Sequence, residues 1–172
     1  MLGGCGGGDD SNFVRGRGLQ PAVLSAATQA AVYDAVVRGA FEVDDPSLSL
    51  LLDPRELPRT VGLDAGMRLS DAVASAMRQR GTVKGTCEPP LTSRRTPRCT
   101  AARPGYVVRF SPVFAMRGDS VAAYIFVQKY DTPSSDYSDP LRFERVYHIV
   151  PAAGGWRAAL EGRVPKEVRG ER

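Results

Sequence analysis

Apolar residues recur at helical spacing in two segments of the first half of the chain. Within the alanine-rich residues 25–38, Val32 and Val36 lie four positions apart, so they fall on one side of a helix. This pattern predicts an amphipathic helix that starts near Ser25. Gly39 follows the run and is a typical C-terminal stop.

A short strand and a second helix are expected next. Residues 47–53 form a brief apolar run between turn residues, which is typical of a buried strand. Ser70 begins the second helix, in which Val73 and Met77 share an apolar face. This helix is expected to end at Gly81.

The second half of the chain shows β-branched and aromatic runs separated by turn residues, which is the pattern of β-hairpins. Helices followed by strands predict an α+β fold, with N-terminal helices packed on a C-terminal antiparallel sheet. We expect a meander of about four strands plus the short extra strand. The four meander strands are expected at residues 105–116, 120–130, 141–150 and 156–161.

The length of 172 residues suits one domain, and 42% apolar residues are enough for a core. Residues 1–20 are rich in glycine and are expected to be a disordered tether. Residues 21–164 are expected to form a single α+β domain. Residues 165–172 are charged and are expected to fray.

The chain has 23 basic and 19 acidic residues, a formal net charge of +4. Most of this charge lies in segment 88–103, which contains Arg94, Arg95, Arg98 and Arg103. This segment is a candidate surface for an anionic partner, but an ordinary solvated loop is the favoured interpretation. Nucleic acid is not the expected partner, because no aromatic residues interleave these arginines.

The three cysteines suggest one internal pair. Cys87 and Cys99 lie 12 positions apart and bracket the basic segment, whereas Cys5 lies in the tether. A Cys87–Cys99 disulfide would stabilise the fold by about 3 kcal/mol through loop closure. The alternative is a pair of thiols in a cytosolic protein. No metal site and no cofactor is expected, since His148 is the only histidine and no Cys-x-x-Cys occurs.

The chain begins with Met1, and the next four residues, Leu2-Gly3-Gly4-Cys5, resemble the lipobox of bacterial lipoproteins. The resemblance implies lipidation of Cys5, export, and a periplasm-facing location in the cell envelope. A signal peptide would have to lie upstream of the motif, because only Met1 precedes it. If the chain truly starts at Met1, a cytoplasmic protein with a glycine-rich tail is the alternative.

The order of elements over residues 21–163 also resembles the nuclear transport factor two-like (cystatin-like) α+β roll. The closing hairpin motif Gly154-Gly155-Trp156-Arg157 contributes to this resemblance. Members of that superfamily use a concave cone for catalysis, ligand binding or dimer assembly. The resemblance therefore implies a fold without implying one function.

His148 is the side chain best suited to proton transfer near neutral pH. On strict alternation it shares a strand face with Glu144, about 13 Å away along the strand. Within a roll, His148, Arg109 and Tyr124 are candidates to line a pocket, with His148 as base and Arg109 as anion holder. The alternative for His148 is a half-exposed strand residue without a chemical role.

The sequence thus favours a lipid-anchored exported protein whose domain binds or scaffolds, with an unidentified ligand. Whether the protein is an enzyme stays open, and we lean towards no catalytic residues. The alternative is a small-molecule-binding or enzymatic roll with its pocket near His148, Arg109 and Tyr124. The sequence makes no prediction of oligomeric state.

Overall fold

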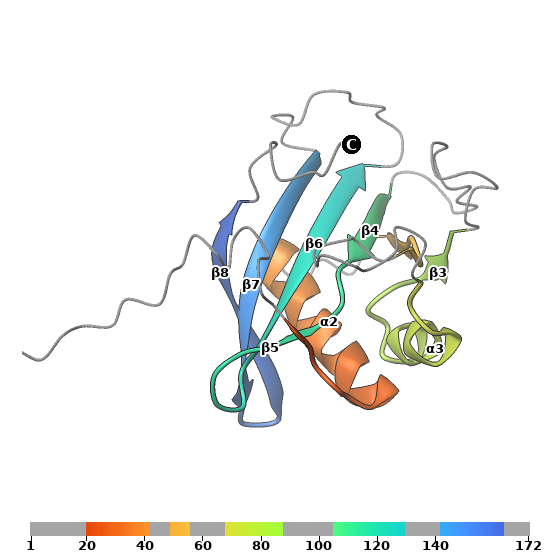
Figure 1. The fold of residues 1–172 in the computed structure, drawn as a ribbon. Coiled ribbons are helices and arrows are strands. Elements are labelled where there is room, and N and C mark those ends of the chain that lie inside the picture. The colour runs from red at the N-terminus through yellow and green to blue at the C-terminus, as the bar shows by residue number, and fades with distance from the viewer. Residues whose placement is uncertain (1–19, 42–48, 56–67, 88–104, 130–141, 164–172) are drawn as a thin grey trace, which may run out of the picture.

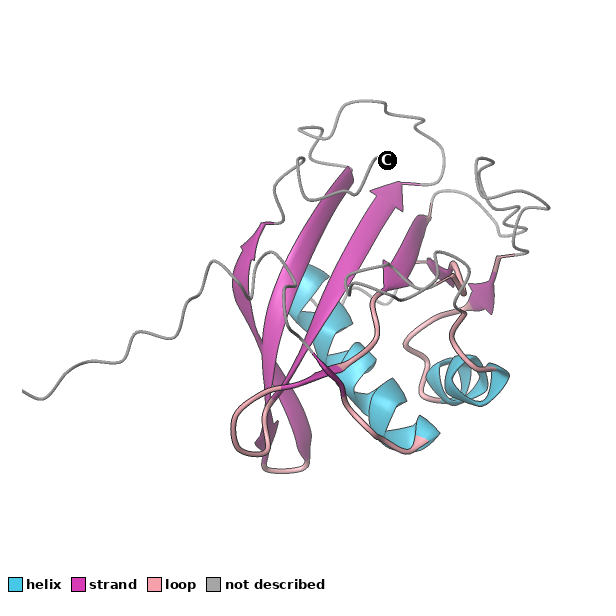
Figure 2. Ribbon diagram, in the orientation of Figure 1, coloured by secondary structure: helices cyan, strands magenta, loops and turns pink. Residues whose placement is uncertain are grey.

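A computed structural model describes residues 20–41, 49–55, 68–87, 105–129 and 142–163. Apart from Gln20, the tether lies outside these residues, as do the charged tail and segment 88–103. Gln20, which the sequence places in the tether, instead lies in a short strand paired with Ala115. Two helices and a curled mixed sheet make up the described structure, which confirms the α+β class (Figures 1 and 2). The elements in chain order are β1 (Gln20–Pro21), α2 (Ala26–Phe41), β2 (Leu50–Leu52), α3 (Asp71–Gln79), β3 (Gly85–Thr86), β4 (Tyr106–Phe110), β5 (Phe114–Ala115), β6 (Val121–Lys129), β7 (Arg142–Ala152) and β8 (Gly155–Arg163).

Helix α2 begins as predicted but continues past Gly39. Ser25 caps its first turn, because the Ser25 hydroxyl accepts a hydrogen bond of 3.1 Å from the backbone N–H of Thr28. Gly39 is therefore not the stop that the sequence predicted. A Cβ atom at this position would lie 3.1 Å from Cε1 of Tyr147, so glycine lets the helix approach β7 closely.

Helix α3 starts at the predicted cap. The Ser70 hydroxyl accepts a hydrogen bond of 3.3 Å from the Val73 N–H, and Asp71 adds negative charge to the first turn. The chain leaves the helix through Gly81, whose φ of 77° suits glycine. Asp34 on α2 accepts a 2.8 Å hydrogen bond from Thr82, so α2 is tied to the segment that follows α3.

The sheet is mixed, which corrects the prediction of a wholly antiparallel sheet. Strand β6 pairs antiparallel with β7 along one edge, and with β4 and then β5 along the other. Strand β7 continues into β8 through a hairpin at Gly154, whose φ is 82°. Strand β2 lies parallel to both β4 and β3. Parallel neighbours need a long crossover connection, and α3 lies within the connection between β2 and β3.

The predicted strand 105–116 is broken into β4 and β5 at Ser111 and Pro112. The Ser111 N–H donates to the Tyr124 carbonyl at 3.1 Å, but the Tyr124 N–H donates to the Ser111 hydroxyl at 2.9 Å. The Ser111 carbonyl instead accepts a hydrogen bond of 2.8 Å from the Tyr33 hydroxyl on α2. The break therefore attaches the helix to the sheet.

The main core lies between the helices and one face of the sheet. In Figure 1, α2 lies behind β6 and β7, and the sheet curls around it. The Tyr33 ring stacks on Phe110 with centroids 4.4 Å apart. A smaller apolar cluster occupies the opposite face of the sheet, which neither described helix covers and which we call the helix-free face. Its buried members are Phe114, Ala122, Tyr124 and Val146.

Replacing Tyr33 by Phe should lower the free energy of unfolding by about 1–2 kcal/mol, because the buried Ser111 carbonyl would lose its hydroxyl donor. Urea unfolding followed by circular dichroism measures this change.

Tyr106→Phe provides the matched control, since Tyr106 is only half-buried. It should change the free energy of unfolding by less than about 0.5 kcal/mol. Equal effects of the two substitutions would show that the Tyr33 hydroxyl does not hold the helix.

Candidate functional site

The three predicted pocket residues lie on one face of the sheet. Arg109 on β4, Tyr124 on β6 and His148 on β7 alternate with residues of the core between the sheet and the helices. They therefore all lie on the helix-free face. Tyr124 is fully buried there, whereas Arg109 is half-buried and the side chain of His148 is 36% exposed.

Strand register separates Arg109 from His148. Arg109 pairs with Phe126 on β6, and His148 pairs with Ala122 on the same strand. The two Cα atoms are thus four residues apart along β6 and two strands apart across the sheet, a distance of about 16 Å. Tyr124 lies between them, so the structure places Arg109 and His148 in two separate groups.

His148 contacts a residue that the sequence did not suggest. Its Nδ1 atom lies 3.6 Å from Oε1 of Glu161 on β8, whose side chain is 38% exposed. A β-bulge between β7 and β8 leaves Glu161 without a register partner, while Leu160 and Gly162 keep theirs. The arrangement matches a half-exposed strand histidine beside a carboxylate.

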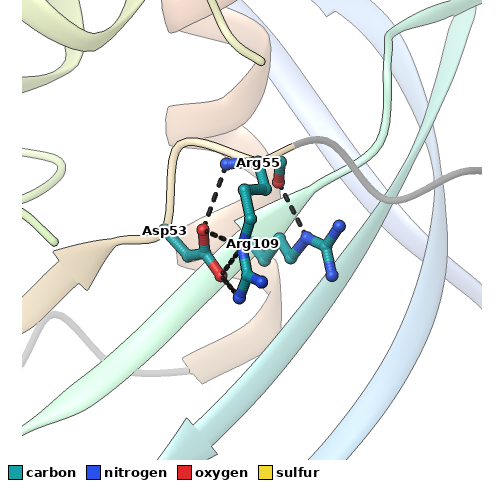
Figure 3. Close-up of polar contacts among 3 residues, drawn as sticks. All are labelled: Asp53, Arg55 and Arg109. Carbon is teal, nitrogen blue, oxygen red and sulfur yellow. Dashed lines mark hydrogen bonds and ion pairs between the residues drawn. The ribbon is translucent and has the colours of Figure 1, made fainter. Parts of the chain in front are cut away.

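Arg109 belongs to a cluster with Asp53 and Arg55, which Figure 3 shows. Asp53 follows β2, and its N–H donates to the Val108 carbonyl at 2.8 Å, which places Asp53 next to Arg109. The Arg55 guanidinium donates to the Asp53 carboxylate, with its closest contact 2.6 Å from Nη2 to Oδ2. Nε of Arg109 donates to the Arg55 carbonyl at 2.8 Å. Sequence reasoning missed Asp53 and Arg55, although Asp-Pro-Arg directly after a buried strand was the available signal.

Burial makes the charge on Arg109 costly. Loss of contact with water lowers the pKa of the Arg109 guanidinium, Asp53 acts in the opposite direction, and Arg55 lowers the pKa further. An arginine remains protonated at any physiological pH, so the cluster always holds a half-buried cation. Asp53 is only 3% exposed and is the carboxylate that compensates this cation.

A second buried carboxylate lies across the helix-free face. Phe126 pairs with Arg109 on one side and with Glu144 on the other, so these three side chains form a row across β4, β6 and β7. Glu144 is 2% exposed. In Figure 3 the end of the Arg109 guanidinium points away from Asp53 and Arg55. The row therefore places one cationic, one aromatic and one carboxyl side chain next to one another across this face.

The predicted disulfide and lipidation residues fall mostly outside the described ranges. Cys87 is 2% exposed, and its N–H donates to the Leu52 carbonyl at 2.7 Å. Cys87 is also disulfide-bonded. Cys5 and Cys99 lie outside the described residues, so the pairing of Cys87 with Cys99 stays a prediction. The four arginines of segment 88–103 lie outside them as well.

In the parts of the chain that the structure describes, no three His, Cys, Asp or Glu side chains come together as a metal site would require. Neither described helix combines the length and apolar character needed to cross a membrane.

No protein-family model, no curated protein and no solved structure matches this chain.

Replacing Asp53 by Asn should lower the free energy of unfolding by about 3 kcal/mol, because two guanidinium groups would lose their buried counter-charge. Chemical denaturation at neutral pH measures the difference.

Asp119→Asn is the matched control, since Asp119 is exposed in the turn between β5 and β6. Its effect should stay below about 0.5 kcal/mol. If Asp53→Asn proved as mild as this control, Arg109 would need a different compensating group.

Proposed function

We propose that this chain is a lipid-anchored, exported α+β domain that binds or scaffolds without catalysing a reaction. The observation that carries the proposal is the use of its cysteines. Cys5 ends the lipobox-like Leu2-Gly3-Gly4-Cys5, and Cys87 is disulfide-bonded. Stable disulfides are typical of oxidising compartments outside the cytosol. The lipobox resemblance and the disulfide thus support export independently.

The contacts of the candidate catalytic residues favour binding over chemistry. Asp53 accepts hydrogen bonds from Arg55, Arg109 donates to the Arg55 carbonyl, and His148 lies beside Glu161. Each of these ionisable groups has a neighbour inside the protein that accounts for its position. The small-molecule pocket has less support, since register keeps Arg109 and His148 about 16 Å apart.

We place the partner-binding surface at segment 88–103. Cys87, directly before it, is buried against Leu51, so the segment starts from a firmly held point of the sheet. A disulfide to Cys99 would close the segment at its other end and present its arginines as one basic loop. Guanidinium groups suit phosphate and carboxylate, so we propose an anionic partner such as lipid headgroups or an acidic protein.

We also propose that the domain is a roll of the cystatin-like kind, with its helices on one face of an antiparallel meander. The packing of α2 against the face formed by β6, β7 and β8 supports this assignment.

If the anchor exists, the N-terminal peptide recovered from native membranes should begin at Cys5 and carry a diacylglycerol group. Mass spectrometry of that peptide measures the modification.

A Cys5→Ser variant should leave the membrane fraction. An unmodified peptide that begins at Met1 in the soluble fraction would contradict the anchor.

Digestion of the exported protein without reductant should yield a peptide that links Cys87 to Cys99. Its mass should be about 2 Da below the sum of the two reduced peptides, because each sulfur loses one hydrogen.

The same linked peptide should appear in the Cys5→Ser variant. A Cys5–Cys87 link would instead assign Cys5 to a disulfide and remove the lipid anchor.

A further inference from the structure

Strand β8 forms an exposed edge of the sheet. Among the described strands it pairs only with β7, and Figure 1 shows it beyond β7 at the outer side of the sheet. Arg157, Ala159 and Glu161 are exposed, and Leu160 is 51% exposed. An edge of this kind presents backbone groups to which another strand can pair.

The direction of those backbone groups follows from the hydrogen bonds of Tyr124. The N–H and C=O groups of Tyr124 both form hydrogen bonds with Ser111 and therefore point away from β7. Tyr124 and its register partner Val146 are thus a non-hydrogen-bonded pair, and the N–H and C=O groups of Val146 point towards β8. Alternation along β7 and β8 then turns the N–H and C=O groups of Ala158 and Leu160 outward. These groups face away from the sheet.

The charged side chains along this edge are complementary to the same side chains of a second copy. Arg157 and Glu161 each lie two residues from Ala159, which pairs with His148 on the helix-free face. If two copies of β8 lie antiparallel with Ala159 opposite Ala159, each Arg157 falls opposite Glu161 of the other copy. Exposed charged side chains normally prevent edge strands from pairing with other strands. In this register, however, the same side chains form two ion pairs across the interface.

The backbone supports the same register. With Ala159 at the centre, Ala158 lies opposite Leu160 of the second copy, and both direct their hydrogen-bonding groups outward. Arg157 and Glu161 then occupy non-hydrogen-bonded positions, where facing Cα atoms approach to about 4.5 Å. The exposed Leu160 side chain would cover Ala158 of the second copy, with Trp156 as its diagonal neighbour.

We propose that β8 pairs with β8 of a second copy of this chain, which joins two sheets into one across a two-fold axis at Ala159. The interface uses the same surface of both copies, so it closes as a dimer and leaves no further β8 edge. The inference uses neither the lipid anchor nor the basic segment, and it stands or falls separately from the proposed function.

Charge reversal tests the register. Arg157→Glu turns both ion pairs into repulsions and leaves the contact between Glu161 and His148 in place. It should weaken dimerisation about tenfold or more in sedimentation velocity over a dilution series. Glu161→Arg should weaken it similarly. The double variant Arg157→Glu with Glu161→Arg exchanges the charges and should restore the dimer.

Lys84→Glu is the matched control, because Lys84 is exposed directly before β3 at the other end of the sheet. It should leave the dimer constant unchanged. Amide hydrogen exchange adds a second readout: the N–H groups of Ala158 and Leu160 should be protected in the dimer and lose protection in Arg157→Glu. A monomer at all concentrations, or a double variant no better than the single ones, would overturn the proposal.

Discussion

The hydrogen bond from the Tyr33 hydroxyl to the Ser111 carbonyl joins the helical part of the chain to the sheet. Ser111 can offer this carbonyl because its own hydroxyl takes over the ladder contact with the Tyr124 N–H. Pro112 follows without an N–H group, so the strand breaks at this point and β5 continues against β6. A buried carbonyl without a donor is costly. The position of α2 on the sheet therefore depends on the break in the strand at Ser111. The same break determines where β5 begins.

The other end of α2 is held by different means. Gly39 allows the helix to approach the ring of Tyr147, and the Arg145 guanidinium donates to the Ala40 carbonyl at 3.3 Å near the helix C-terminus. The buried side chains between this side of the sheet and the helices are mostly apolar. The helix-free face holds a half-buried cation beside its apolar cluster, because Arg109 loses contact with water there and is compensated by Asp53. A cation held in this way is fixed in position by its neighbours.

Local signals in the sequence predicted the elements well where a local interaction decides them. Ser70 does cap α3, and Gly154 does form the hairpin turn, because a cap and a turn need only neighbouring residues. Gly39 looked like a helix stop, yet its role depends on Tyr147, which is distant in the sequence. The β-branched and aromatic residues on both sides of Ser111 likewise hid the break, although Pro112 was a local signal for it, since the advantage of breaking comes from Tyr33.

The sequence by itself determined the α+β class and the alternation of side chains along each strand, because this alternation is a local property of a strand. That Arg109, Tyr124 and His148 share one face follows from the pairing of β4, β6 and β7. Only the tertiary structure decided which of these residues lie together. The parallel entry of β2 brings Arg55 to Arg109, 54 positions away, and the register along β6 keeps His148 apart from them. The pairing of strands that are distant in the sequence depends on how much apolar surface each arrangement buries. This contribution to the free energy of folding cannot be read from any local stretch of sequence.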